Sequence, residues 1–391
     1  MIRFLRLMRM GNLKQNLLEL LSRQAQEDLP AFSGEELAAR FSVTRAAVWK
    51  AVQALREEGY QIEGRRNLGY RLVNAHDFVS APLIGRFLTP ESKAFYRIEC
   101  FETVSSTNTL LKARAAEGAP AGTVLIAEMQ TAGRGRLGRS FYSPKGSGIY
   151  LSVLLRPDLP AANAVQLTAA AAAAGALALE SAFPGLPEGS VRIKWVNDLF
   201  LDAHKICGIL TEGMLSMESG KLEYAIVGIG FNLKAPEGGW PDELKGIAGG
   251  LPDGIAGNDS RVKVVSEFLN VFLELTKDLS AQRFLPEYSK RQLVAGQYVE
   301  VLRSGAASAA ASTPAPALAA ASGAAAASDS ADSTAGTSSS ADSGPVSNAD
   351  GRNIALALGI DGQCRLIVRY PDGSEEHLNS GEVRIVPMTR Q

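Results

Sequence analysis

The sequence contains few of the residues that bind metals or form disulfides. Its 391 residues include 3 cysteines and 3 histidines, at Cys100, Cys207, Cys364, His76, His204 and His377. No C-x-x-C or H-x-x-x-H spacing occurs, so a structural zinc site is not expected. Three scattered cysteines also fit a reducing compartment better than a disulfide-stapled secreted domain.

Long apolar runs are absent as well. The longest, Leu167 to Leu179, is mostly alanine and is shorter than the roughly 20 residues that a bilayer-spanning helix needs. Arg3 and Arg6 interrupt the N-terminus, so no apolar signal-peptide region is expected there. We therefore expect a soluble cytoplasmic protein.

The chain carries no large net charge of either sign. Its 40 Lys and Arg balance 41 Asp and Glu, which leaves a formal net charge of -1. This balance excludes a globally basic nucleic-acid coat and an acidic tail protein, but it permits a local basic patch. Hydrophobic residues make up 46% of the chain. That fraction is enough to form hydrophobic cores, and the length leaves room for about two or three domains.

One segment differs in composition from the rest. From Ser304 to Gly351 the chain is almost wholly Ala, Ser, Gly, Thr, Pro and Asp, without aromatic residues, Lys or Arg. Such a segment cannot bury enough apolar surface to offset its ordering entropy, so we expect a disordered loop. Strand patterns flank it at 297–302 and 354–358. The insertion is therefore predicted to occupy a turn of one small β domain, because long surface-loop insertions cost little.

The first 75 residues predict a helix-turn-helix followed by a wing. Ser33 with Glu36 three residues later is a capping-box start. A second helix begins after Thr44, and its apolar face repeats at helical spacing. Two short helices with a tight turn form the helix-turn-helix pattern, and the strand-like segments 60–63 and 70–73 predict a hairpin after it.

The second helix of this unit is the candidate for DNA recognition. It would lie in the major groove, and paired arginines on the hairpin would touch phosphate. The side chains concerned are Arg45, Trp49, Lys50 and Gln53 on the helix, and Arg65 and Arg66 on the hairpin. The alternative is a winged helix that serves packing or protein contacts.

The middle of the chain, roughly 80–290, mixes strand and helix patterns, as an α/β or α+β core does. Strands are predicted at 122–129, 148–155, 191–195 and 224–229, and helices at 106–117, 164–182 and 262–279. The most specific motif, Gly-Arg-Gly-Arg-Leu-Gly-Arg at 133–139, directly follows one of these strands.

The backbone of this motif can approach a ligand closely, and its side chains carry permanent positive charge. Its glycines permit backbone conformations that other residues avoid, and its arginines present planar forks to phosphate or carboxylate. It also satisfies G-x-G-x-x-G, but a dinucleotide fingerprint should open a helix, and here a Ser-Phe-Tyr-Ser-Pro segment follows. We interpret it as an anion-cradling loop that orders over its ligand. The alternative is a basic, flexible surface loop.

Four further signals are weaker. Lys194, Asn197 and Asp198 at a strand end offer a phosphate donor, an amide and a magnesium ligand, although a solvated charge cluster explains their composition more simply. Gly228–Asn232 reads as a tight turn that presents Asn232, with or without a binding role. The Ser-Ser-Thr-Asn run at 105–108 precedes a helix and is explained by simple N-capping. Trp240 lies in a loop rich in Gly and Pro and is either a hydrophobic plug or a stacking surface.

Together these motifs resemble the biotin–protein ligase family, in its bifunctional form that also represses the biotin operon. The 133–139 motif resembles the family's Arg-Gly loop, and Lys-Trp-Val-Asn-Asp at 194–198 resembles its Lys-Trp-Pro-Asn-Asp motif. Residues 204–209 are similar to the segment that carries its biotin-contacting lysine. The resemblance covers nearly the whole chain except the insertion. Val196 replaces the usual proline, which frees φ and restores a backbone donor, so we expect adjusted geometry and retained activity.

The resemblance implies a role for each candidate residue. Those that bind biotin would be Ser106, Thr107, Asn108, Gln130, Arg134, Gly135, Arg136 and Lys205. Those that bind ATP or the adenylate would be Arg136, Arg139, Lys194, Asn232 and Trp240. Lys194, Arg136 and Lys205 would be catalytic, and Asp198 would bear on Mg²⁺.

The fold that the resemblance implies is α+β and multidomain. It comprises a winged helix-turn-helix at 1–75, a mixed α/β biotin ligase core at 76–290, and an SH3-like small β barrel at 291–391 with the insertion 304–351. The implied activity joins biotin, through biotinoyl-5'-AMP formed from ATP with Mg²⁺, to a lysine of the biotin carboxyl carrier protein of acetyl-CoA carboxylase. An adenylate-bound homodimer would repress biotin-synthesis genes at operator DNA. The alternatives are a lipoate or octanoate ligase, and a ligand-sensing repressor without ligase activity.

Overall fold

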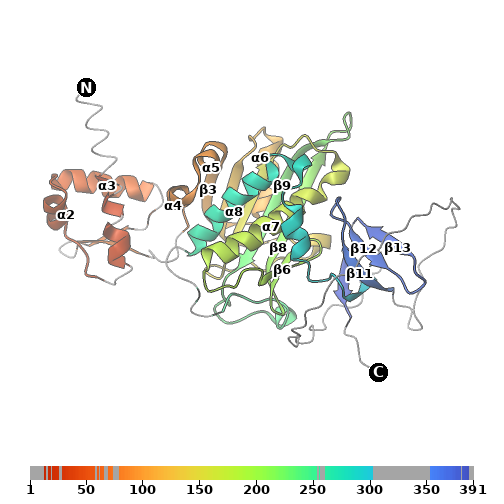
Figure 1. Cartoon of the computed structure of the whole chain (residues 1–391). Helices are drawn as coiled ribbons and strands as arrows, with labels where there is room; N and C mark the ends of the chain where they lie inside the picture. Colours follow the sequence, from red (N-terminus) through yellow and green to blue (C-terminus); the bar gives the residue numbers. More distant parts are fainter. Residues whose placement is uncertain are drawn as a thin grey trace.

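The computed structural model arranges the chain as three successive units, with the N-terminal and C-terminal units on either side of a central sheet (Figure 1). It describes residues 13–14, 16–18, 20–25, 29–57, 60, 62–65, 69–73, 79–252, 255, 260–302, 353–379 and 381–386. The predicted insertion at 304–351 and Arg66 lie outside the described residues.

The N-terminal unit confirms the predicted helix-turn-helix and hairpin. Its helices include α2 (Gly34–Arg40) and α3 (Arg45–Glu57), and its hairpin is β1 (Ile62–Arg65) with β2 (Gly69–Leu72), which pair antiparallel. Both halves of the capping box form at Ser33 and Glu36, and the Thr44 hydroxyl accepts from the backbone N–H of Ala47. These bonds satisfy helix-start donors that would otherwise lack partners, so the two helices begin where the sequence predicts.

A mixed sheet of seven strands forms the centre of the molecule. Their spatial order is β3-β4-β5-β9-β8-β7-β6, and all pairs are antiparallel except β3 with β4. The strands are β3 (Arg97–Val104), β4 (Thr123–Gln130), β5 (Gly148–Leu155), β6 (Val191–Lys194), β7 (Asp198–Leu201), β8 (His204–Leu215) and β9 (Leu222–Asn232). The four predicted strands of this region correspond to β4, β5, β6 and β9.

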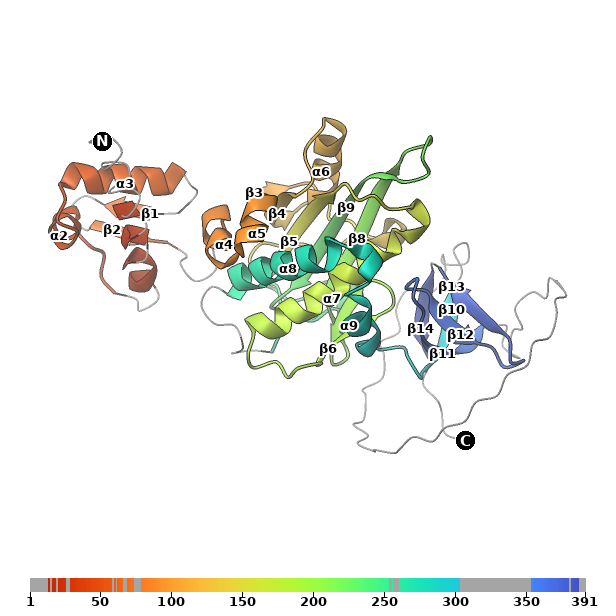
Figure 2. The same ribbon diagram turned by 45° about the horizontal axis from the view of Figure 1, so that its top comes forward.

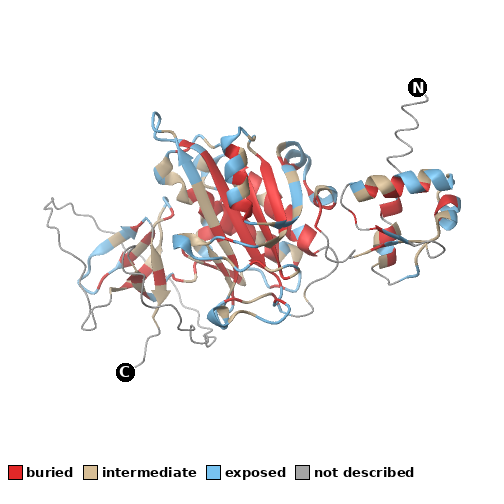
Figure 3. Cartoon of the chain, turned by 180° about the vertical axis from the view of Figure 1, so that it is seen from behind, coloured by how far each residue is buried: buried red, intermediate tan, exposed pale blue. Residues whose placement is uncertain are grey.

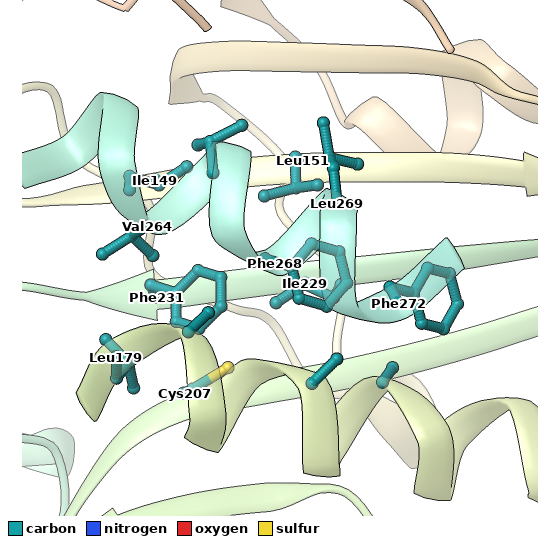
Figure 4. Close-up of a cluster of buried hydrophobic side chains, with 14 of the residues drawn as sticks. Ile149, Leu151, Leu179, Cys207, Ile229, Phe231, Val264, Phe268, Leu269 and Phe272 are labelled. Atoms are coloured by element: carbon teal, nitrogen blue, oxygen red, sulfur yellow. The ribbon is translucent and has the colours of Figure 1, made fainter. Parts of the chain in front are cut away.

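Two long helices cover one face of this sheet. They are α7 (Val165–Ala182) and α8 (Ser260–Thr276), which lie side by side (Figure 2). Strand side chains alternate between faces, so Ile229 and Phe231 of β9 meet Phe268 and Phe272 of α8 (Figure 4). The alanines of α7 let helix and sheet approach closely. Figure 3 shows the buried residues concentrated along the central strands.

The position of α7 in the core explains why its sequence is so apolar. By length and composition Ala161–Ala182 could cross a membrane, but 72% of its apolar window is buried inside the protein. The segment therefore has the burial of a core helix. On the opposite face of the sheet, α6 (Thr107–Ala116) packs through Leu111 and Ala115 on Leu125, Leu154 and Ile226.

Shorter helices complete the central unit. They are α4 (Ala81–Phe87), α5 (Pro90–Phe95) and α9 (Leu285–Lys290). Asn270 of α8 holds the junction of the first two, since its side chain accepts from Thr89 N and donates to the Phe87 carbonyl, at 3.0 Å each.

The C-terminal unit is a five-stranded antiparallel sheet. Its spatial order is β13-β12-β11-β10-β14, and its strands are β10 (Tyr298–Leu302), β11 (Ile354–Ile360), β12 (Leu366–Arg369), β13 (Glu375–Leu378) and β14 (Glu382–Ile385). The strands predicted on the two sides of the insertion are β10 and β11, and they pair directly, with Tyr298 opposite Leu356. The insertion therefore connects two neighbouring strands of one sheet, as the sequence predicts.

A buried arginine joins three elements of the central unit. Arg291, 1% exposed, donates from Nη1 to Glu180 Oε1 at 2.7 Å and from Nη2 to Glu180 Oε2 at 2.9 Å. It also donates to the Val191 carbonyl at 3.0 Å and pairs with Glu287. The side chain thereby joins α7, the start of β6 and the end of α9, next to the chain's exit toward the C-terminal sheet.

We expect Arg291→Met to lower the free energy of unfolding by about 3–5 kcal/mol, because it leaves the buried Glu180 carboxylate without its cation. The measurement is thermal denaturation followed by circular dichroism. The matched control is Lys290→Met, whose exposed ammonium lies 3.5 Å from Glu188 and 3.8 Å from Glu287. The control should change stability by less than about 0.5 kcal/mol. Equal effects of the two substitutions would contradict this account of Arg291.

Candidate functional site

The strand register aligns the candidate residues on one face of the central sheet. Across five neighbouring strands, Tyr150 lies opposite Gly230, Gly230 opposite Gly208, Gly208 opposite Asp198, and Asp198 opposite Lys194. Cross-strand partners project to the same side of a sheet. This row therefore carries Asp198 and Lys194 on the face opposite α7 and α8.

Two glycines in this row make room for an aromatic ring. A Cβ at Gly230 would lie 2.3 Å from Phe141 Cε1, and one at Gly208 would lie 2.9 Å from Phe141 Cε2. The Phe141 ring is thus packed directly against the strand backbone and meets Tyr150 edge-on at 6.4 Å between centroids. Phe141 was not a predicted site residue. The signal in the sequence was its place two residues after the Arg-Gly motif.

One sequence interpretation is corrected here. Residues 228–232 are not a tight turn, because they belong to strand β9. The glycines are needed for the space above the strand, and no reversal of the chain occurs there: Gly230 accommodates Phe141, and a Cβ at Gly228 would lie 2.0 Å from Asn108 Oδ1. The period-2 pattern of the preceding apolar residues continues through them.

A buried polar cluster lies at the start of α6. Ser106 caps the helix, as N-capping predicts, and the backbone N–H of Thr107 donates to Gln130 Oε1 at 2.8 Å. The hydroxyl of Ser152, fully buried on β5, lies 2.7 Å from Thr107 Oγ1 and 2.6 Å from Asn108 Oδ1. The structure therefore brings together four of the residues predicted to bind biotin, namely Ser106, Thr107, Asn108 and Gln130. It adds Ser152, whose only signal was a single serine in an apolar strand.

The Arg-Gly loop follows β4 and forms a single 3-10 turn at Arg136–Gly138. It opens no α-helix, in agreement with the rejection of a dinucleotide fingerprint. Each arginine has its own partner. Arg134 Nη1 lies 3.3 Å from Glu212 Oε1, and Arg139 Nη2 donates to Glu382 Oε2 at 2.7 Å.

Arg136 joins the loop to two other parts of the chain. Its Nη1 donates to Asn197 Oδ1 at 3.0 Å, and its Nη2 donates to the Gly381 carbonyl at 3.1 Å. Asn197 in turn donates to the Ile209 carbonyl at 2.8 Å. Arg136 therefore holds together the loop, the 194–198 motif and the turn before β14.

The 194–198 motif sends its side chains to opposite sides, as strand alternation predicts. Trp195 is buried and donates from Nε1 to the Cys364 carbonyl of the C-terminal unit at 3.0 Å. Lys194 lies on the site face, with Nζ 6.0 Å from the centre of the Phe200 ring. The Trp195–Val196 peptide bond is cis, and the Val196 carbonyl accepts from Tyr288 Oη at 3.1 Å.

Lys194 and Lys205 differ in their environments. Burial lowers the pKa of the Lys194 ammonium, and the charges of Asp198 and Glu382 act in the opposite direction. Lys205 Nζ forms an ion pair with Asp198 Oδ1 at 2.7 Å. Asp198 therefore neutralises the charge of Lys205, whereas the charge of Lys194 is only partly compensated. This arrangement favours the binding of an anion.

Asn232 lies at the side of the site that Lys205 occupies, and Trp240 lies in the segment that follows β9. Asn232, at the end of β9, is 6% exposed, and its Nδ2 lies 3.5 Å from the Lys205 carbonyl. The segment after β9 returns to Lys205, whose N–H donates to the Ile247 carbonyl at 2.8 Å. Trp240 meets Tyr142 edge-on, with 6.5 Å between ring centroids.

The donor set around Asp198 suits a metal ion that arrives with its own ligands. Within the described part of the chain, no group of three or more His, Cys, Asp and Glu side chains is placed to hold a metal. Mg²⁺ commonly binds through one or two carboxylates together with substrate phosphates. A single carboxylate beside two lysines fits that mode and does not fit an all-protein metal cage.

Helix α3 exposes most of the predicted DNA-contacting side chains. Arg45, Trp49 and Lys50 are exposed, with Trp49 at 53%, whereas Gln53 is half-buried. The opposite face of the helix is buried through Val48, Ala51, Val52 and Leu55. Arg65 ends strand β1 on the hairpin.

Comparisons with known proteins match all three units. Residues 100–232 match the biotin/lipoate A/B protein ligase family, residues 14–71 match a helix-turn-helix domain, and residues 348–385 match the biotin protein ligase C-terminal domain. The solved structure of the biotin protein ligase from Aquifex aeolicus in complex with biotin and ATP has the same fold. It has a TM-score of 0.54 and 24% identity, and the match covers 75% of this chain and 100% of that one.

Two curated relatives extend the likeness beyond single domains. The bifunctional ligase/repressor BirA of Bacillus subtilis is 35% identical over 276 residues, which are 71% of this chain and 82% of that protein. BirA of Escherichia coli is 34% identical over 201 residues, 51% of this chain and 59% of that protein. By this extent of similarity, the chain belongs to the family of bifunctional biotin–protein ligases and repressors.

Proposed function

We propose that the polar face of the central sheet is where this chain carries out the biotin ligation of its family. The chain is an ATP-dependent biotin–protein ligase that also acts as a transcriptional repressor. The placement of the reaction rests on one observation. A single row of cross-strand neighbours leads from the glycines under Phe141 to Asp198 and Lys194. The Arg-Gly loop lies beside this row, because its Arg136 donates a hydrogen bond to Asn197.

The cluster at the start of α6 suits the ring of biotin. A ligand ring with N–H donors and a carbonyl acceptor needs a few converging polar groups within an otherwise apolar site. Thr107, Gln130 and Ser152 supply those groups, and Phe141 supplies an apolar wall. Ser106 orients them as the helix cap, and Asn108 lines the site from α6. The match of residues 348–385 to the biotin protein ligase C-terminal domain favours biotin over lipoate or octanoate.

The first chemical step forms a mixed anhydride. A carboxylate oxygen of biotin bonds to the α-phosphorus of ATP, and the bond from that phosphorus to the pyrophosphate oxygen breaks. Negative charge grows on the phosphate oxygens, so fixed cations lower the barrier electrostatically. In our proposal Lys194 meets the α-phosphate, Lys205 meets the carboxylate, and Arg134 and Arg136 close over both, with Gly135 between them. Mg²⁺ held with ATP would add positive charge at the phosphates, and Asp198 is the carboxylate that would help to hold it.

The second step transfers the acyl group to a carrier protein. The ε-amine of the carrier lysine attacks the acyl carbon, the carbon–oxygen bond to phosphate breaks, and AMP leaves while the amine loses a proton. An ordered loop protects the anhydride from water. Arg136 and Arg139 hold that loop through Asn197, Gly381 and Glu382. Asn232 and Trp240 would contact the adenine of the adenylate.

The remaining assignments concern the whole chain. We propose units at 1–75, 76–290 and 291–391, with the insertion 304–351 within the last. The C-terminal unit is proposed to close as an SH3-like barrel, which its five short antiparallel strands support. A homodimer is proposed because a two-fold operator matches a two-fold protein. The biotin carboxyl carrier protein is the proposed acceptor, and three free cysteines fit the cytoplasm.

The ligase assignment is tested by the intact mass of a recombinant biotin carrier domain incubated with this protein, biotin and Mg-ATP. We expect the mass to increase by one biotin, and no increase without ATP. Arg136→Ala should release biotinoyl-5'-AMP into solution at least about tenfold faster, because the loop loses its bonds to Asn197 and Gly381. Unchanged release of the intermediate would count against the role of Arg136.

A second test separates the effect of Lys194 on the stability of the fold from its role in adenylate formation. Because burial lowers the pKa of Lys194, its charged form destabilises the folded state at neutral pH. This cost diminishes as the pH rises through the lowered pKa toward the ordinary value of a lysine. Lys194→Met should therefore raise the melting temperature, by an amount that corresponds to about 1 kcal/mol in the free energy of unfolding. The same substitution should abolish adenylate formation. Lys93→Met, on the exposed face of α5, should leave both unchanged. A lower melting temperature for Lys194→Met would refute this electrostatic account.

The DNA interface is tested by gel shift on DNA upstream of biotin-synthesis genes. Trp49→Ala and Lys50→Ala should each weaken adenylate-dependent binding by about tenfold or more, because these exposed side chains lie on the proposed recognition helix. Biotinylation should stay at the wild-type rate. Glu35→Gln, on the exposed side of α2, serves as the matched control. Binding that does not depend on the adenylate, or that ignores both substitutions, would refute this interface.

A further inference from the structure

Glu212 is a carboxylate in a row of apolar neighbours. On the site face of the sheet it lies opposite Ile226, and Ile226 lies opposite Leu154. Both neighbours belong to the apolar cluster under α6. The Glu212 side chain is 20% exposed. A carboxylate largely removed from water is stable only with hydrogen-bonding or charged partners, so its partners indicate its purpose.

The two oxygens of Glu212 contact two different parts of the proposed biotin site. Oε2 accepts from Asn108 Nδ2 of α6 at 2.9 Å. Oε1 lies 3.3 Å from Arg134 Nη1 in the Arg-Gly loop. One carboxylate thus connects the helix that carries the polar cluster to the loop that closes over the ligand.

The contact with Asn108 fixes which way its amide points. An ionised carboxylate accepts hydrogen bonds and donates none, so Glu212 requires the amide nitrogen of Asn108 on its side. The same nitrogen donates to the Leu210 carbonyl at 3.2 Å. The amide oxygen is then directed to Ser152 Oγ, 2.6 Å away. Asn108 is 4% exposed, and Gly228 leaves the space for it, so the orientation cannot be exchanged for a solvated one.

The contact with Arg134 leaves most of the guanidinium available. A guanidinium carries five N–H donors in a planar fork, and the Glu212 contact is made through Nη1. A ligand carboxylate can therefore be bound by the same arginine while Glu212 holds it in place. The single positive charge of Arg134 then lies between two negative charges.

We propose that Glu212 is a positioning residue for biotin, one that couples recognition of the ring to closure of the loop over the carboxylate. Through Asn108 it sets the hydrogen-bonding direction of Ser152 and Thr107, and through Arg134 it holds the loop at the carboxylate end. The inference rests on the biotin site proposed above.

Two substitutions separate the two contacts. Glu212→Gln retains an acceptor for Asn108 but removes the negative charge from Arg134. It should release biotin about fivefold faster, whereas the primary amide of biotin, which lacks the carboxylate, should be released at the wild-type rate. Glu212→Ala also leaves the buried Asn108 donor without this partner, so both ligands should bind at least about tenfold more weakly.

Stopped-flow release and calorimetry on the full chain give these values. Adding Glu212→Gln to Arg134→Gln should cause no further loss, because in that background Glu212 has no guanidinium to hold at the carboxylate. Glu274→Gln, an exposed carboxylate on α8 that pairs with Lys277 and Arg283, is the control and should change nothing.

Two outcomes would overturn the role of Glu212. One is a Glu212→Gln variant equal to wild type with both ligands, and the other is one that weakens both ligands equally. Failure of the wild-type protein to bind biotin would instead refute the proposed site itself. The two failures are distinguishable because the wild-type measurement comes first and does not involve Glu212.

Discussion

The alternation of side chains across one sheet is the constraint on which the rest of this structure depends. Strand β9 shows it most directly: Ile229 and Phe231 pack under α7 and α8, while Gly228 and Gly230 between them face the site. The same strand therefore completes the hydrophobic core and the floor of the ligand site. A shift of register by one residue would place phenylalanine in the site and glycine in the core.

A second constraint is the dependence of the Arg-Gly loop on residues far away in the chain. Its arginines contact β8, the 194–198 motif and the C-terminal sheet through Glu212, Asn197, Gly381 and Glu382. The C-terminal unit is in turn docked on Trp195. A glycine-rich loop has a large conformational entropy to lose, and these charged contacts are what hold it in one place. The polar cluster at α6, by contrast, is held by burial.

Much of the fold could be predicted because its signals are local. The capping box at Ser33, the apolar face of α3 and the strands on both sides of the insertion all depend on residues within a few positions of one another. The segment 228–232 was misinterpreted for the same reason. Gly and Asn in sequence favour a turn, and only the approach of Phe141 and Asn108 from elsewhere explains why a strand needs glycine there.

The sequence by itself determined the order of the units, the helix-turn-helix, most of the strands around the site and the charged motifs, since each is carried by periodicity, capping or spacing along the chain. Only the tertiary structure decided which of those motifs share a face. Ser152, Phe141 and Glu212 became site residues because strand pairing places them beside Asn108, Gly230 and Arg134. Such proximity is set by register between distant segments and by the volume of opposing side chains, and neither is encoded in any short stretch of sequence.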